Sequence, residues 1–223
     1  MKQKIEETIK KYKLINPGEK IILGVSGGPD SIAMLDVLRQ LKNEMNFEIY
    51  VVHINHNIRG KDADEDEKYV KRYCQKYNIK CFSRKIDVPT IARNEKIGTE
   101  EAGRKVRYEY FDEILKETNS NKIAIAHNKN DKVETIIMHL LRGSGVSGLR
   151  GIEPIRENKF IKPLIECDRQ EIEKYCQENN LQPRIDKTNF ENEYTRNKIR
   201  NIVIPYIKEQ FNPNIIETIT RLA

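Results

Sequence analysis

The stretch "ILGVSGGPDSIAML", residues 22–35, places a short loop of glycine, serine, proline and aspartate between two apolar runs. The run before the loop belongs to "KIILGV" (20–25), whose β-branched residues predict a buried strand. The residues after it carry Met34, Leu38 and Leu41 at helical spacing, which predicts a helix with one buried face. A strand that passes through such a loop into a helix is typical of α/β proteins that bind an anion at the helix N-terminus.

The loop "SGGPDS" (26–31) has the groups that a phosphate site needs. Glycine lets the backbone approach a ligand closely, and serine hydroxyls donate hydrogen bonds. Proline suits the first helical turn, where its missing N–H costs nothing. Free amides and the helix dipole complete an anion cradle. We therefore predict phosphate contacts at Ser26, Gly27, Gly28, Pro29 and Ser31.

Asp30 is the unusual member of this loop, because a carboxylate beside phosphates is repulsive unless a cation lies between them. Mg²⁺ is the natural mediator, so Asp30 is a predicted metal ligand. The alternative is that Asp30 only complements the dipole of the following helix. The loop lacks the lysine of GxxxxGK[ST] and does not fit GxGxxG, which disfavours ordinary P-loop NTPases and nicotinamide enzymes.

The rest of the chain repeats the strand–helix alternation. Further strands are predicted at 47–55, 79–86 and 122–127, each followed by a helical segment. Such units require a Rossmann-like parallel sheet with helices on both faces and ligands at the carboxyl ends of the strands. A small hairpin and a helix capped by Asp168 are expected next, then helices interrupted at Pro205 and Pro213. No linker divides the chain, so we predict one domain, 1–223, with a helical extension from about 186.

Composition narrows the class of protein. The 223 residues include 40 Lys+Arg and 34 Asp+Glu, a formal charge of +6 that is compatible with a polyanionic partner. The four cysteines are scattered, which favours reduced thiols over disulfides or a metal cluster. No signal peptide or apolar span is present, so the chain is predicted to be cytoplasmic and to cross no membrane. The sequence does not determine the oligomeric state.

The chain resembles a known family at several motifs. The loop resembles the SGGxDS pyrophosphate loop of the N-type ATP pyrophosphatases, an adenine nucleotide α-hydrolase-like fold. The further motifs resemble those of the tRNA(Ile)-lysidine synthetases: "VVHINHNIRG" (51–60), "EEAGRKVRYEYF" (100–111), "AHNKNDKVETIIMHLLRGSGVSGLRG" (126–151) and "DKTNFENEYTRNKIRNIVIP" (186–205). Asn55, Ala126, Asn128 and Asn130 depart from the family's pattern, which puts catalytic roles at 128 and 130 in doubt.

The resemblance implies a reaction and its participants. ATP, with Mg²⁺, would activate the wobble cytidine of the isoleucine tRNA that carries a CAU anticodon. The amine of free L-lysine would then displace AMP, giving lysidine, AMP and pyrophosphate. The family is often longer, and the helical pattern still runs at "ETITRLA" (217–223), so we expect either a short form or the N-terminal part of a longer protein.

Charged and polar side chains outside the loop are assigned roles on the same basis. Because the loop has no lysine, positive charge is expected from Arg104 and Arg107, three residues apart on one helix, with a surface ion pair as the alternative for each. Asp131 and Glu134 share a helix face, and one of them is expected to recognise the lysine ammonium or act as base. Asp131 is also a second candidate metal ligand, and the alternative for both acids is dipole matching.

The remaining candidates follow strand ends or the last motif. His53 and His127 are predicted nucleotide contacts, although a buried core histidine is the equal alternative. Arg196 and Arg200, one turn apart near Tyr194, are expected to contact RNA or lysine, or else to join the C-terminal helices to the rest of the fold. The complete set of predicted substrate contacts is Thr135, Arg142, Arg196, Asn197 and Arg200.

Two competing functions remain open at this stage. A tRNA-thiolating enzyme with a similar loop would need clustered cysteines, which the spacing here does not provide. A non-catalytic module that binds adenine nucleotides would leave the polar residues at 127–135 and 186–200 without a role.

Overall fold

A computed structural model describes residues 1–184, 191 and 194–222. Its sheet has six strands in the order β3-β2-β1-β4-β6-β5, and all neighbours are parallel except β5 and β6. The predicted parallel strands and the hairpin are thereby confirmed. The strands are β1 (Lys20–Gly24), β2 (Glu48–Asn55), β3 (Cys81–Lys85), β4 (Lys122–Ile125), β5 (Ile155–Arg156) and β6 (Phe160–Ile161).

Helices cover both faces of this sheet, as predicted. Ile21 and Leu23 of β1 pack with α1 (Lys2–Tyr12), α2 (Pro29–Leu41), α3 (Lys61–Lys76) and α7 (Arg169–Glu178) in one core. Ile22, which points the other way, packs against α5 (Thr99–Glu117), and α4 (Val88–Glu95) packs on α5. The alternation along β1 follows from the pleat of a strand buried on both sides. Asp168 caps α7, also as predicted.

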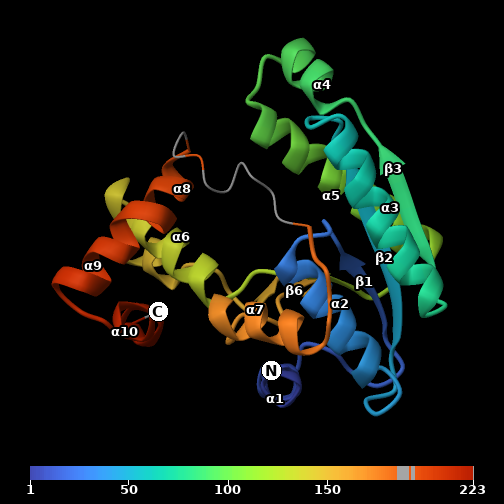
Figure 1. The fold of residues 1–223 in the computed structure, drawn as a ribbon, viewed down its shortest axis with the longest axis horizontal. Helices are drawn as coiled ribbons and strands as arrows, with labels where there is room; N and C mark the ends of the chain where they lie inside the picture. The colour runs from blue at the N-terminus through green and yellow to red at the C-terminus, as the bar shows by residue number, and fades with distance from the viewer. Residues whose placement is uncertain (185–190, 192–193, 223) are drawn as a thin grey trace.

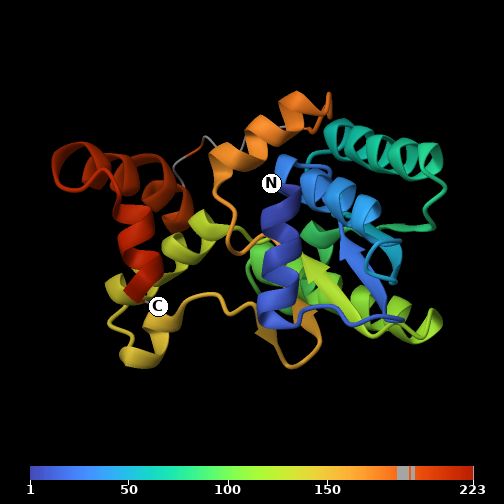
Figure 2. The same ribbon diagram turned by 90° about the horizontal axis from the view of Figure 1, so that it is seen from below.

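The C-terminal helices form their own layer against α6 (Lys129–Leu141), whose carboxyl end continues into a 3-10 turn, η1 (Val146–Arg150). Val133, Ile137, Ile199, Ile204 and Ile216 make a separate hydrophobic cluster there. Figures 1 and 2 show this group set to one side of the strands. Its helices are α8 (Thr195–Lys198), the π-helical turn η3 (Ile199–Val203), α9 (Ile204–Gln210) and α10 (Ile215–Leu222).

Of the two predicted helix interruptions in this layer, the structure confirms the one at Pro213 and contradicts the one at Pro205. α8 begins at Thr195, with Tyr194 as its N-cap residue. Pro213 separates α9 from α10, as expected, whereas Pro205 lies in the first turn of α9, where the chain changes from π to α geometry without a break. The first part of the predicted extension, from 186, lies outside the described residues. No helix in the described part of the chain is long and apolar enough to cross a membrane.

The strand order places a crevice between β1 and β4. β1 pairs with β2 on one side and with β4 on the other, so the chain reverses its direction of growth at β1. Ligands of open α/β sheets bind at this switch point, outside the carboxyl ends of the strands. The loop after β1 and the start of α6 after β4 therefore meet there.

Candidate active site

A cavity of about 720 Å³ opens at these carboxyl ends, a size typical of small-molecule sites. It is lined by the loop after β1, the end of β2, one face of α5, the segment after β4 and the start of α8. The structure thus gathers most of the predicted residues around one space. Those that line the cavity are Ser26, Gly28, Asp30, Ser31, His53, Arg107, His127, Arg196 and Asn197.

The loop is closed around the hydroxyl of Ser31. Ser31 Oγ accepts hydrogen bonds from the amides of Ser26 and Gly27, both at 3.2 Å, and donates to the carbonyl of Gly28 at 3.0 Å. Gly27 has φ +98°, which the left-handed turn of the loop requires, and Pro29 opens α2. The amide contacts are long, and a phosphate oxygen is a stronger acceptor than a hydroxyl. The converging amides therefore suit an anion, while Gly27 and Pro29 shape the loop without lining the cavity.

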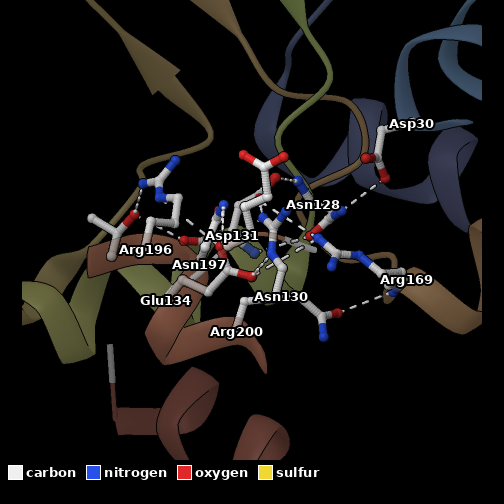
Figure 3. A network of polar contacts seen from close by, with 11 residues as sticks. Asp30, Asn128, Asn130, Asp131, Glu134, Arg169, Arg196, Asn197 and Arg200 are labelled. Carbon is white, nitrogen blue, oxygen red and sulfur yellow. Dashed lines mark hydrogen bonds and ion pairs between the residues drawn. The ribbon is translucent and has the colours of Figure 1, made fainter. Parts of the chain in front are cut away.

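Asp30 and Asp131 approach each other across the crevice, with Asn128 between them (Figure 3). Burial, and then the negative charge of Asp131, raise the pKa of Asp30. Asn128 Nδ2 donates to Asp30 Oδ1 at 2.8 Å. Asn128 is also the N-cap of α6. Its side-chain Oδ1 accepts a hydrogen bond from the backbone amide of Asp131, and its backbone amide donates to Asp131 Oδ2. The helix-capping alternative for Asp131 is thus observed, and Asp131 does not line the cavity.

The other positions that depart from the family pattern also have local partners. Asn55 is 1% exposed and donates to Asp64 and Glu67 of α3, two bonds that a carboxylate could not make. Asn130 Oδ1 accepts the amide hydrogen of Arg169, the first residue of α7. These amides connect neighbouring elements, which gives them a structural role.

Glu134 lies at the centre of a carboxylate–arginine cluster, defined as Asp131, Glu134, Arg169, Arg196 and Arg200. Arg200 Nε and Nη2 donate to the two Glu134 oxygens at 2.7 and 2.8 Å, and Nη2 also reaches Asp131 Oδ1 at 3.0 Å. Arg169 and Arg196 lie 3.8 and 3.9 Å from Glu134. Burial alone would lower the pKa of Arg200, but the hydrogen bond and charge of Glu134 outweigh it and raise that pKa. Both Glu134 oxygens are occupied, so a role as base would require Arg200 to move.

The two C-terminal arginines bind to α6, whereas Asn197 bonds to the segment before α8. Arg196 Nη2 donates to Thr135 Oγ1 at 2.9 Å, and Asn197 Nδ2 donates to the carbonyl of Glu191 at 2.7 Å. Thr135 does not line the cavity. Arg200 is hydrogen-bonded to Glu134 of α6. The structure thus shows the alternative, in which these arginines join the C-terminal helices to the rest of the fold. Arg196 also lines the cavity, so a substrate contact stays a prediction for it.

The predicted arginines are separated by the fold. Arg107 lines the cavity, and its side chain is exposed to that open space. Desolvation by the surrounding protein lowers the pKa of its guanidinium. Arg104 is exposed, lies over the ring of Tyr108 at 5.2 Å and does not line the cavity. Arg142 is exposed at the carboxyl end of α6, also outside the lining. The structure therefore brings only Arg107 of these three to the site.

The histidines at the cavity are neutral near pH 7. His53 is 2% exposed, its Nδ1 is bonded to the Val25 carbonyl at 2.8 Å, and burial lowers its pKa. Burial lowers the pKa of His127 and of His56 to about 4. His53 Nε2 and His127 Nδ1 are buried without a hydrogen-bond partner among the described residues. A nucleotide contact therefore stays a prediction for His53 and His127.

Arg169 was not among the residues predicted from the sequence. This residue follows the capping Asp168 at the start of α7 and reaches both carboxylates of the cluster, at 4.0 Å from Asp131 and 3.8 Å from Glu134. Its only signal in the sequence was its place just after a helix cap that follows a strand. Arginines are common there for many reasons, so the signal could not have identified it.

The donor set fits a Mg²⁺ ion that is held partly by phosphates. Among the residues that the structure describes, no group of three His, Cys, Asp or Glu side chains is arranged to hold a metal alone. Mg²⁺ is normally bound by one or two carboxylates together with phosphates and waters. Burial, and then the negative charge of Asp131, raise the pKa of Asp30, and a bound cation would favour its charged form against both effects. Asp30 fits this role better than Asp131, whose two oxygens both accept hydrogen bonds.

Comparison with known proteins agrees with this geometry. The PP-loop domain model matches residues 1–207. The tRNA(Ile)-lysidine synthase of Clostridium tetani (strain Massachusetts / E88) is 54% identical over 97% of the chain and 46% of its own length. That of Petrotoga mobilis (strain DSM 10674 / SJ95) is 45% identical over 99% of the chain and 70% of its own length.

A solved structure shares the fold. The U34-tRNA thiolase NcsA from Methanococcus maripaludis, with its [4Fe-4S] cluster, superposes with a TM-score of 0.80 at 19% identity, over 99% of the chain and 76% of its own chain. The chain spans about half the length of its clostridial relatives. By the match to the PP-loop model and the identity to these relatives, the chain belongs to the PP-loop domain family and, within it, to the tRNA(Ile)-lysidine synthases.

Proposed function

We propose that the chain ligates L-lysine to carbon 2 of the wobble cytidine of CAU-anticodon tRNA(Ile), consuming ATP and releasing AMP and pyrophosphate. One observation carries the proposal: the cavity is lined by a phosphate loop and by Arg196, which belongs to the carboxylate–arginine cluster, in a chain of the lysidine synthase family. The loop suits the phosphates of ATP. The cluster offers carboxylates and guanidinium groups, which match the ammonium and carboxylate groups of a free amino acid.

In the first step, the cytidine O2 attacks the α-phosphate of ATP and pyrophosphate leaves. We assign the amide of Ser26 and the hydroxyl of Ser31, two residues that line the cavity, to stabilise the charge that gathers on pyrophosphate. Arg107 lines the same cavity and supplies positive charge in place of a loop lysine. Asp30 would hold Mg²⁺, which supplies Lewis-acid stabilisation at the phosphates when bound.

In the second step, the amine of lysine attacks carbon 2 of the activated cytidine and AMP leaves. The carboxylate–arginine cluster is the region that suits free lysine, because Asp131 and Glu134 match its ammonium groups and the arginines match its carboxylate. Lysine would compete with Arg200 for Glu134, since Arg200 holds both oxygens. Its amine must lose a proton before attack, and Asp131 or Glu134 is the candidate acceptor.

The tRNA would enter beside α8. Tyr194 is 56% exposed and lines the cavity together with Arg196. The ring of Tyr194 offers a surface on which a base can stack, and Arg196 offers a positive charge. The formal charge of +6 favours an RNA partner. We propose that the protein acts in the cytoplasm, where tRNA and ATP are both present.

The thiolation alternative has little support from the side chains. None of the four cysteines, all of which lie in the described part of the chain, lines the cavity. Cys74, Cys167 and Cys176 are buried in the hydrophobic core. The likeness to a thiolase rests on the fold alone, at 19% identity.

The test incubates the protein with ATP, labelled lysine and CAU-anticodon tRNA(Ile), and measures label on the RNA together with pyrophosphate. We expect both signals, and neither with a tRNA whose wobble base is not cytidine. Asp30→Asn should stop pyrophosphate release while the circular dichroism spectrum stays unchanged. Pyrophosphate without labelled RNA would contradict lysine ligation, and no pyrophosphate at all would favour a binding module.

A further inference from the structure

Asn128 occupies the junction between the two halves of the site. It is 0% exposed and lies between the loop after β1 and the first turn of α6. Its side chain contacts Asp30, which is 98 residues away in the sequence, and Asp131, which is three residues away. It is therefore the point at which the phosphate loop meets the helix that carries the carboxylate–arginine cluster.

The orientation of the Asn128 amide is determined by its two neighbours. The oxygen must face the amide of Asp131, which is a donor and lies at 2.9 Å. The nitrogen must then face Asp30 Oδ1, an acceptor at 2.8 Å. The cap of α6 and the contact to Asp30 thus use opposite ends of one rigid group, and neither end can turn without the loss of both bonds.

Asp30 depends on this contact. Among the described residues, Asn128 is the only side chain that donates a hydrogen bond to the Asp30 carboxylate. Burial, and then the negative charge of Asp131, disfavour the charged form of the Asp30 carboxylate, whereas the hydrogen bond from Asn128 favours it. With Oδ1 tied to Asn128, the rotamer of Asp30 is held and Oδ2 is left for a ligand in the cavity, which Asp30 lines.

From these contacts we infer that Asn128 is a positioning residue for Asp30, holding one carboxylate oxygen so that the other faces the cation and phosphates of Mg·ATP. The inference rests on the proposed function, in which Asp30 holds Mg²⁺. It assigns a role to a position that departs from the family's pattern and where a catalytic role was in doubt.

The test compares variants that keep the helix cap but change the contact to Asp30. Asn128→Ser keeps an acceptor for the Asp131 amide and removes the donor to Asp30. Asn128→Asp keeps the cap and turns the donor into a repelling oxygen. The double variant Asp30→Asn with Asn128→Asp restores a hydrogen bond with the donor at position 30, so it separates loss of contact from loss of the carboxylate. Asp87→Ser, at the N-cap of α4, is the matched capping control.

The readout is the affinity of the full chain for ATP by calorimetry, with Mg²⁺ and with EDTA, and the thermal midpoint. Both single variants should weaken ATP binding about tenfold with Mg²⁺ and less than about twofold in EDTA, since one hydrogen bond to a charged group is lost. The double variant should regain the thermal midpoint lost by Asn128→Asp but not the affinity with Mg²⁺. Asp87→Ser should leave both affinities unchanged.

Other results overturn the inference. Wild-type affinity in folded Asn128→Ser, or an equal loss with and without Mg²⁺, would show that the residue acts only as a helix cap. If Asn128→Asp fails to fold, Asn128→Ser alone decides between these outcomes. No lysine or tRNA is present, so the inference can fail while lysine ligation stands. Absence of Mg·ATP binding by the wild-type chain would instead overturn the proposed function, and the inference with it.

Discussion

Replacing Arg200 by methionine removes the guanidinium that faces two acidic side chains of α6. Glu134 is 1% exposed and receives both of its short hydrogen bonds from Arg200, at 2.7 and 2.8 Å. Leaving such a buried charge unpaired costs about 3–5 kcal/mol. Arg169 and Arg196 remain within 4.0 Å and take over part of the charge, so we expect a loss of about 2 kcal/mol in the free energy of unfolding.

The loss is measured by urea unfolding and by the thermal midpoint, which should fall by about 4–8 °C for a chain of this size. Lys68→Met is the matched control, because Lys68 pairs with Glu65 at 2.7 Å on an exposed face, where solvent screens the pair and its loss should leave the unfolding free energy almost unchanged. Adding Glu134→Gln to Arg200→Met should recover part of the stability, since the unpaired charge is gone. The reasoning is refuted if Arg200→Met costs no more than Lys68→Met, or if the double variant is no more stable than Arg200→Met alone.

Three further results are expected. Because burial lowers the pKa of His56 to about 4, the unfolded chain binds its proton first as the pH falls below the ordinary value of 6.5. When the pH falls from 7 to 5, this histidine should lower the free energy of unfolding by about 2 kcal/mol. His56→Asn should abolish that part of the loss, which is measured by urea titrations at the two pH values. Gly27→Ala should lower the free energy of unfolding by about 1–2 kcal/mol and weaken ATP binding, because φ +98° is unfavourable for alanine; calorimetric affinity equal to that of the wild type would contradict this role. Arg107→Ala should slow pyrophosphate release about 100-fold, whereas Arg104→Ala should change it less than about twofold, and equal effects would show that the cavity does not separate the two arginines.

Local sequence patterns predicted the sheet and its phosphate loop. The β-branched runs at 20–25 and 122–127 are buried on both faces, and such runs favour central parallel strands wherever they occur. The sequence predicted a glycine loop between strand and helix, but only the structure shows that Gly27 has the positive φ while Gly28, at φ −75°, does not. Asp168 was recognisable as a cap because the capping box needs only residues of one segment.

The same local patterns could not predict contacts between residues from distant segments of the chain. Arg104 and Arg107 look equivalent in the sequence, yet the way α5 packs on the sheet turns only Arg107 to the cavity. Arg169 joins the carboxylates of α6 only because α7 begins beside them. Both outcomes depend on helix rotation and packing, which the hydrophobic pattern specifies only to within a face.

The sequence by itself therefore determined the alternating α/β class, the anion loop and the family, because strand burial, turn conformation and motif spacing are properties of short segments. The tertiary structure alone decided that Asn128 holds Asp30 and that Arg200 occupies Glu134. These contacts join residues 98 and 66 positions apart, and their geometry depends on how β1, β4 and the C-terminal helices pack together.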